Sequence, residues 1–255
     1  MKILSFDTTT RRGSVALLEG ETIVAENILQ TEVTHTESLL PAIQNLLSQA
    51  DWRIHDVGGI ALAIGPGSFT GLRVGLATAK GLAKAGNIPL VGISSLLALA
   101  HNALFSSIPV AALLDAKRKE VYATCTQFEN GNLKKILLEE RALDPKILCA
   151  ALRNFGAVFL LGDGAEVYRE LFKKELGAKA IFAPKPMMFL KAGWVGFLAY
   201  PELVKQKGNE WEKLVPNYIR ASDAILCPLP FPSPLVGGHS QSSRHLGRQW
   251  RCSEG

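Results

Sequence analysis

Hydrophobic and polar positions alternate along the chain with the period of a strand or the period of a helix. Three short apolar runs separated by polar turns predict strands over residues 2–7, 14–18 and 22–28. A helix is expected over 38–50, because its apolar residues recur every three or four positions. The same two periods then predict a strand over 57–64, a helix over 71–85, a strand over 88–92 and a helix over 94–104.

The order of elements restarts after residue 108. A strand predicted over 109–115 ends in Asp115, as the first strand ends in Asp7. The elements expected after it are strands over 120–128 and 133–138, a helix over 144–153, a strand over 158–161 and helices over 165–176 and 189–200. This repeated order indicates an internal duplication. It predicts two α/β halves that face each other, with a hinge near residues 104–108.

Composition and charge place the chain in a broad class. Of its 255 residues 47% are hydrophobic and 20% charged, as in ordinary soluble globular proteins. No apolar run reaches the roughly 18 residues of a membrane helix, and Asp7 comes too early for a secretory signal, so we expect a cytoplasmic protein without a membrane partner. The net charge of +5 permits contact with nucleic acid without predicting it. Alternating prolines over 228–234 predict a disordered tail over 227–255.

Spacing of the reactive side chains predicts neither a metal site nor a nucleophile. The four cysteines form no CxxC pair, the five histidines form no HxxxH or HExxH, and no G-x-S-x-G elbow is present. Asp115 and Asp163 follow predicted strands. One of them could serve as the base or a metal ligand of a phosphotransferase. Alternatively, both carboxylates only accept hydrogen bonds within their own turns.

Two loops of the first half are candidates for anion binding. The turn of Asp7, Thr8, Thr9 and Thr10 suits a phosphate through its hydroxyl and N–H groups, with Asp7 toward a cation. The usual glycine two residues after the aspartate is replaced by Thr9, so the alternative is a polar turn capped by its own side chains. The loop over 65–71 follows a strand and opens a helix, but it is neither a P-loop nor G-x-G-x-x-G.

At these motifs the sequence resembles the bacterial TsaB family, also called YeaZ. The motifs are ILSFDTT (3–9), HTE (35–37) ahead of LLP (39–41), GPGSFTGLRVG (65–75), DAKRKEVY (115–122), GDG (162–164) and PNYIR (216–220). The resemblance covers residue 1 to about residue 220, and its most specific part is the loop over 65–75.

The resemblance implies an α/β protein with the actin-like, Hsp70-like ATPase (ASKHA) fold. It would have one ribonuclease-H-like lobe over 1–105 and a second, degenerate one over 106–226. The family implies a non-catalytic relative of TsaD, which works with TsaD and the ATPase TsaE to make N6-threonylcarbamoyladenosine in tRNAs that read ANN codons. Where TsaD has the two histidines of its metal motif, this sequence has Ser95 and Leu99. Leucine cannot ligate a metal, so neither a metal nor a catalytic residue is expected.

The resemblance also indicates a partner surface on the helices over 38–50 and 71–85. The second helix carries small residues at every fourth position, which either pack on the chain's own sheet or admit a helix of the TsaD-type subunit. The same surface would form a homodimer when that subunit is missing. The candidate interface residues are Leu39, Leu40, Ile43, Leu46, Leu47, Gly67, Phe69, Gly71, Leu72, Arg73, Gly75, Leu76, Ala79 and Ala83.

Two readings from other classes stay open beside the accessory subunit. One is an ATP-dependent small-molecule kinase or a metallopeptidase of the same fold. The other is an autonomous RNA-binding protein, for which the only basic clusters are Arg11 and Arg12 and the run from Lys117 to Lys119. No cofactor is expected, although weak or interface-dependent binding of ATP or ADP is left open.

Overall fold

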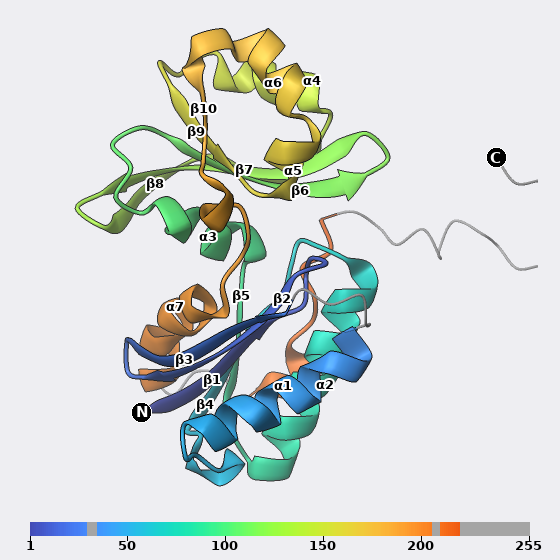
Figure 1. The fold of residues 1–255 in the computed structure, drawn as a ribbon, viewed down its shortest axis with the longest axis vertical. Coiled ribbons are helices and arrows are strands. Elements are labelled where there is room, and N and C mark those ends of the chain that lie inside the picture. Colours follow the sequence, from blue (N-terminus) through green and yellow to red (C-terminus); the bar gives the residue numbers. More distant parts are fainter. Residues whose placement is uncertain (30–34, 206–209, 220–255) are drawn as a thin grey trace, which may run out of the picture. The chain divides into compact units, whose positions relative to one another are not determined.

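The first sheet is built from five strands, β1 to β5, that all lie before residue 94 (Figure 1). The computed structural model describes residues 1–29, 35–205 and 210–219. The strands are β1 (Lys2–Asp7), β2 (Gly13–Glu19), β3 (Thr22–Leu29), β4 (Gly59–Ala63) and β5 (Leu90–Ile93). Their order is β3-β2-β1-β4-β5, with antiparallel pairs up to β1 and parallel pairs beyond it.

The second sheet repeats this arrangement strand for strand. It consists of β6 (Val110–Lys117), β7 (Glu120–Glu129), β8 (Asn132–Leu143), β9 (Val158–Leu161) and β10 (Ala180–Phe182). The order β10-β9-β6-β7-β8 has the same pattern of two antiparallel and two parallel pairs. The predicted internal duplication is therefore confirmed, and the fold is the actin-like one of two ribonuclease-H-like lobes.

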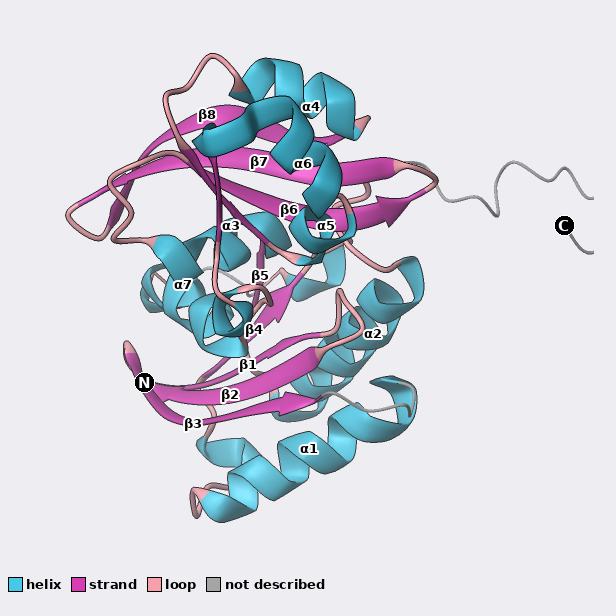
Figure 2. Ribbon diagram, turned by 45° about the horizontal axis from the view of Figure 1, so that its top comes forward, coloured by secondary structure: helices cyan, strands magenta, loops and turns pink. Residues whose placement is uncertain are grey.

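Helices cover the outer face of each sheet and fill the space between the sheets (Figure 2). The outer helices are α1 (His35–Gln49) and α2 (Phe69–Gly86) on the first sheet, and α4 (Pro145–Leu152) and α6 (Arg169–Leu176) on the second. The inner helices are α3 (Ser95–Ala100) and α7 (Ala192–Val204). Neighbouring side chains of a strand point to opposite faces, so Ile3 joins the inner core and Leu4 packs beneath α1.

Helix α7 packs on the first sheet, although the sequence analysis assigns this part of the chain to the second lobe. It contacts β1, β2 and β4. The Ser5 hydroxyl donates to the carbonyl of Ala192 at 2.8 Å, and the Glu26 carboxylate accepts from the N–H of Gly193 at 2.7 Å. The helix is apolar almost all round, so it is stable only when covered on several sides. The described residues accordingly belong to one compact unit whose inner core is shared by both sheets.

Most predicted elements are confirmed within a few residues, and three are not. The helix expected over 165–176 is broken at Tyr168 into α5 (Asp163–Val167) and α6, because Tyr168 has a non-helical backbone. Strand β8 runs five residues further than expected, and β10 was not predicted because three residues carry too little periodicity. Short 3-10 turns lie at Ile54–Asp56, His101–Ala103, Gly177–Lys179, Lys185–Met187 and Trp211–Lys213. The expected tail over 227–255 lies outside the described residues.

Candidate functional site

The glycine loop between β4 and α2 closes directly over the first hairpin. A β-carbon on Gly71 would lie 1.9 Å from the carbonyl oxygen of Thr8, and one on Gly67 would lie 2.5 Å from that of Thr9. Two hydrogen bonds hold the contact: Ser68 N–H donates to Thr9 O at 2.6 Å, and Thr8 Oγ1 donates to Gly71 O at 2.8 Å. The glycines therefore allow one backbone segment of this chain to approach another, without any need for a ligand.

The hairpin residues that suit a phosphate are buried under this loop. Asp7, Thr8 and Thr9 are almost completely inaccessible to solvent. The N–H of Thr9 donates to Asp7 Oδ1 at 2.9 Å, which is the turn capped by its own side chain that the sequence left open. A phosphate could approach the Thr8 and Thr9 backbone only if the start of α2 moved away.

Packing also accounts for Ser95 and Leu99, where the resemblance led us to expect no metal ligand. Ser95 and Leu99 are fully buried in α3. The hydroxyl of Ser95 accepts from Gly65 N–H at 3.1 Å, so it anchors the glycine loop, while Leu99 belongs to the inner core. Within the described ranges, no group of three histidine, cysteine, aspartate or glutamate side chains is placed to hold a metal.

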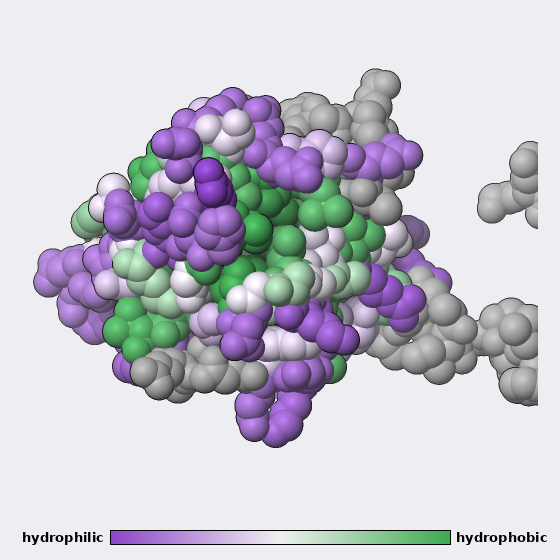
Figure 3. All heavy atoms as spheres, turned by 90° about the horizontal axis from the view of Figure 1, so that it is seen from below, coloured by the Kyte–Doolittle hydropathy of each residue, from purple (hydrophilic) through white to green (hydrophobic). Residues whose placement is uncertain are grey.

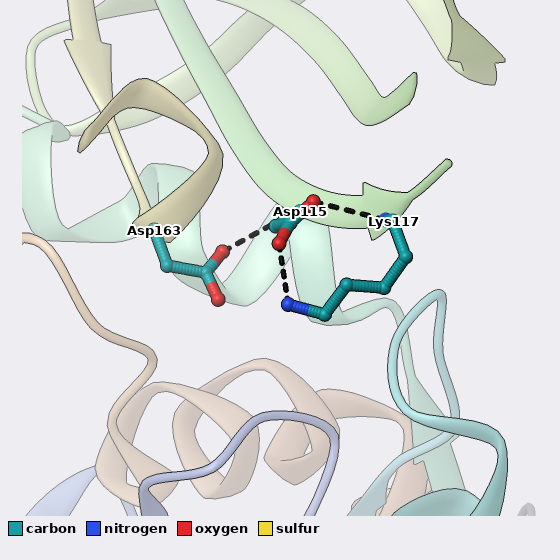
Figure 4. Close-up of polar contacts among 3 residues, drawn as sticks. All are labelled: Asp115, Lys117 and Asp163. Carbon is teal, nitrogen blue, oxygen red and sulfur yellow. Dashed lines mark hydrogen bonds and ion pairs between the residues drawn. The ribbon is translucent and has the colours of Figure 1, made fainter. Parts of the chain in front are cut away.

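The hairpin of the second lobe holds an internal ion pair (Figure 4). Lys117 folds back to Asp115, with Nζ 2.5 Å from Oδ2 and its backbone N–H 2.9 Å from Oδ1. Asp163 Oδ1 accepts from the backbone N–H of Asp115 at 2.9 Å. Desolvation raises the pKa of Asp163, although part of its residue surface still faces solvent. Asp115 is thus bonded within its own turn, as one of the two alternatives from the sequence has it, whereas Asp163 is bonded to the backbone of Asp115 in the neighbouring strand.

Many of the candidate interface residues belong to the core of this chain. Leu39, Ile43, Leu46 and Leu47 form the buried face of α1, which packs on the first sheet. Helix α2 likewise turns a buried stripe to the sheet: Gly71, Leu72, Gly75, Ala79 and Ala83.

Gly75 of α2 lies so close to Thr8 and Leu62 that no larger residue would fit there without a shift of its neighbours. A β-carbon there would lie 2.4 Å from Thr8 Oγ1 and 3.1 Å from Leu62. The expectation that these small residues admit a partner helix is therefore wrong, because they let α2 approach β1 and β4. Leu40 is 46% exposed and Arg73 is exposed, whereas Gly67, Phe69 and Leu76 are half-buried. Of the candidate interface residues, only these five are exposed or half-buried.

A groove of mixed polar and apolar lining lies on the same face, between α1, α2 and the segment that joins α1 to β4. Its volume is about 480 Å³. It is lined by Leu40, Ile43, Gln44, Leu47, Ser48, Asp51, Trp52, Ile54 and Leu82. Seen from below, the molecule shows apolar surface surrounded by polar side chains (Figure 3).

Residues 210–219 return to the start of α2, which the sequence analysis did not foresee. Asn217 N–H donates to Ile64 O at 2.7 Å, and Lys80 Nζ donates to the carbonyl of Glu212 at 2.8 Å. The Tyr218 ring lies 5.0 Å from that of Phe69, on which the Arg73 guanidinium stacks at 3.9 Å. The only signal was the motif PNYIR itself, because this contact joins positions about 150 residues apart.

The two repeated sheets define the class: a two-lobed actin-like protein in which the described residues assemble no metal centre. A family model described as TsaD, tRNA N6-adenosine threonylcarbamoyltransferase, matches residues 23–226. The chain is 29% identical to the tRNA threonylcarbamoyladenosine biosynthesis protein TsaB of Bacillus subtilis, over 88% of this chain and 96% of the relative. It is 32% identical to TsaB of Haemophilus influenzae, over 78% and 87%.

Solved structures agree with these relatives. A Pseudomonas aeruginosa protein described as similar to the peptidase YeaZ superposes with a TM-score of 0.72 at 30% identity, over 86% of this chain and 99% of that one. YeaZ from Pseudomonas aeruginosa gives a TM-score of 0.69 at 26% identity, over 85% and 99%. The chain belongs to the TsaB (YeaZ) family. In its described part we find no helix with the length and apolar character that crossing a membrane requires.

Proposed function

We propose that this chain is a non-catalytic subunit of tRNA threonylcarbamoyladenosine synthesis. It binds a TsaD-type threonylcarbamoyltransferase and, with a TsaE-type ATPase, supports formation of N6-threonylcarbamoyladenosine next to the anticodon of tRNAs reading ANN codons. The names of its relatives support the pathway. The observation that carries the non-catalytic role is that Ser95 and Leu99, at the positions of the TsaD metal motif, are buried packing residues.

The partner surface that we propose combines the groove with the exposed start of α2. Leu40 lies at the groove, and Leu76 is half-buried on α2. Tyr218, Phe69 and Arg73 add an aromatic and cationic stack. At protein interfaces a few aromatic and arginine side chains, seated in or beside pockets, contribute most of the binding energy. The chain alone would form a homodimer through the same surface.

We also propose that the isolated chain binds ATP or ADP weakly at most. The backbone of Gly67 and Gly71 occupies the space above Thr8 and Thr9 where a phosphate would have to lie. Any stronger nucleotide binding would then require groups from a partner.

Co-purification with the TsaD-type subunit tests the proposal, followed by a modification assay on tRNA with and without this chain. Leu40→Glu places a charge at the groove and should weaken partner binding at least tenfold, because an interfacial charge without a partner is costly to desolvate. Ile147→Glu is the matched control, since Ile147 is 60% exposed on α4, on the second sheet. Equal binding by both variants would place the interface elsewhere.

The modification assay separates the accessory role from an enzyme. Threonylcarbamoyl transfer should need both subunits, and this chain alone should give none. Transfer by the repurified chain alone would contradict a non-catalytic role, and so would metal-dependent peptidase turnover.

A further inference from the structure

The turn between β6 and β7 adopts a backbone that its residues disfavour. Lys117, Arg118 and Lys119 have φ values of 59°, 50° and 64°, three successive left-handed residues without a glycine. A side chain in this region costs free energy, which glycine avoids and asparagine reduces. Stability therefore does not explain three cations in this turn. Strained backbone of this kind gathers at functional sites.

A second basic group surrounds Phe189, just before α7. The Arg12 guanidinium of the first hairpin lies 5.1 Å from the Phe189 ring, and Lys191 Nζ lies 5.9 Å from it. Arg11 is exposed beside Arg12, and Phe189 is half-buried. An aromatic ring between cations is the arrangement with which proteins bind bases and phosphates of single-stranded nucleic acid.

The two basic groups are connected through α5. Asp163, at its start, accepts from Asp115 N–H next to the strained turn, and Glu166, three residues on, pairs with Lys185. Lys185 is four residues before Phe189, a distance of at most about 14 Å along an extended chain. A series of contacts thus runs from the hairpin of the second lobe through α5 to the segment before α7, where Arg12 of the first hairpin lies over Phe189.

The carboxylates along this path are already engaged. Asp115 pairs with Lys117, Glu166 pairs with Lys185, and Asp163 accepts a backbone hydrogen bond. Of the basic side chains, Arg11, Lys117, Arg118 and Lys119 are exposed, while Arg12 and Lys191 are half-buried. The surface consequently presents more positive than negative charge to an approaching polyanion.

We propose that this basic rim binds the phosphate backbone of the tRNA. The basic rim consists of Arg11, Arg12, Lys117, Arg118, Lys119 and Lys191 around Phe189. The inference rests on the proposed function, which makes tRNA the substrate of the complex. It assigns RNA contact to a surface formed by the hairpins of both lobes, away from the groove between α1 and α2.

The test measures binding of an unmodified tRNA transcript that reads an ANN codon to the complete complex, by fluorescence anisotropy at several salt concentrations. The variant Arg118→Gly/Lys119→Gly removes two charges and at the same time relieves the backbone strain. Affinity should fall about tenfold, and the slope of log K against log salt should fall by about 1 to 2, as two lost phosphate contacts require. Its melting temperature should be equal or higher.

Two controls make the result specific. Lys134→Ala/Lys135→Ala removes the same charge from β8, at a position paired with Gln127, about 20 Å along β7 from the strained turn. It should leave affinity and slope unchanged. Arg118→Lys/Lys119→Arg keeps both charges and should bind as the unmodified chain does. Arg12→Gln removes one charge from the first hairpin and should also weaken tRNA binding. It keeps the inference testable should the glycine variant fail to fold.

Equal affinity and slope for the glycine variant, Arg12→Gln and the β8 control would overturn the inference. Co-purification with the TsaD-type subunit separates this outcome from failure of the proposed function. If the unmodified chain binds that subunit and only the rim variants prove neutral, the rim is wrong and the proposed function stands. If the unmodified chain does not bind the subunit, the proposed function itself fails.

Discussion

Replacing Gly71 by alanine should separate the glycine loop from the first hairpin. The new β-carbon would lie 1.9 Å from Thr8 O, whereas real contacts begin near 3.0 Å, so the start of α2 must shift by about 1 Å. That shift strains the bonds from Thr8 Oγ1 to Gly71 O and from Ser68 N–H to Thr9 O. Overpacking costs about 1–3 kcal/mol and each lost hydrogen bond about 1 kcal/mol. We expect a loss of about 3–5 kcal/mol in the free energy of unfolding.

The same helix provides the matched control. Gly81 is exposed, and a β-carbon there meets nothing within 4 Å, so Gly81→Ala should gain about 0.5–1 kcal/mol from helix propensity. Thermal and urea unfolding followed by circular dichroism measure both variants. For a protein of this size the melting temperature should fall by about 6–20 °C in Gly71→Ala and rise slightly in Gly81→Ala. Equal stability of the two variants would refute the close approach of α2 to the hairpin.

Two further outcomes follow from the buried hairpin and from the inner core. Calorimetry should show no stronger ATP binding for Thr9→Gly than for the unmodified chain, because the Gly67 backbone still covers the hairpin. A clear gain in affinity would mean that the Thr9 side chain is the only obstacle to the phosphate. Burial lowers the pKa of His101 below 6.5, so the folded state favours the neutral ring. Its stability contribution is complete above about pH 6.5 and is lost as the pH falls through the lowered value. Chemical unfolding between pH 7.5 and 5.5 should therefore show a shallower pH dependence in His101→Gln, and an unchanged one would exclude His101 as its source.

The sequence predicted local features well because local features follow from neighbours in the chain. Ser94 caps α3 and Asp144 caps α4, and each cap bonds to a backbone N–H only two or three residues further along the chain. The duplication could also be read, because each half repeats the same order of elements. Which surface covers a helix could not be predicted. Gly75 and Ala79 have the spacing of a helix contact, but spacing does not tell whether the sheet or a partner covers them. The return of Tyr218 to Phe69 has no periodic signal at all.

Duplication explains why the two hairpins are comparable and why their differences matter. Both follow the first strand of their sheet and both begin with an aspartate, Asp7 or Asp115. In the first, the glycine loop and α2 cover the turn, so its polar groups serve packing. In the second, no such cover is needed, because Lys117 neutralises Asp115 and the turn stays exposed with its strained backbone. Arg118 and Lys119 extend from this exposed turn beside the Asp115–Lys117 pair, and the charge of this surface is the reason why we assign it to a ligand outside the chain.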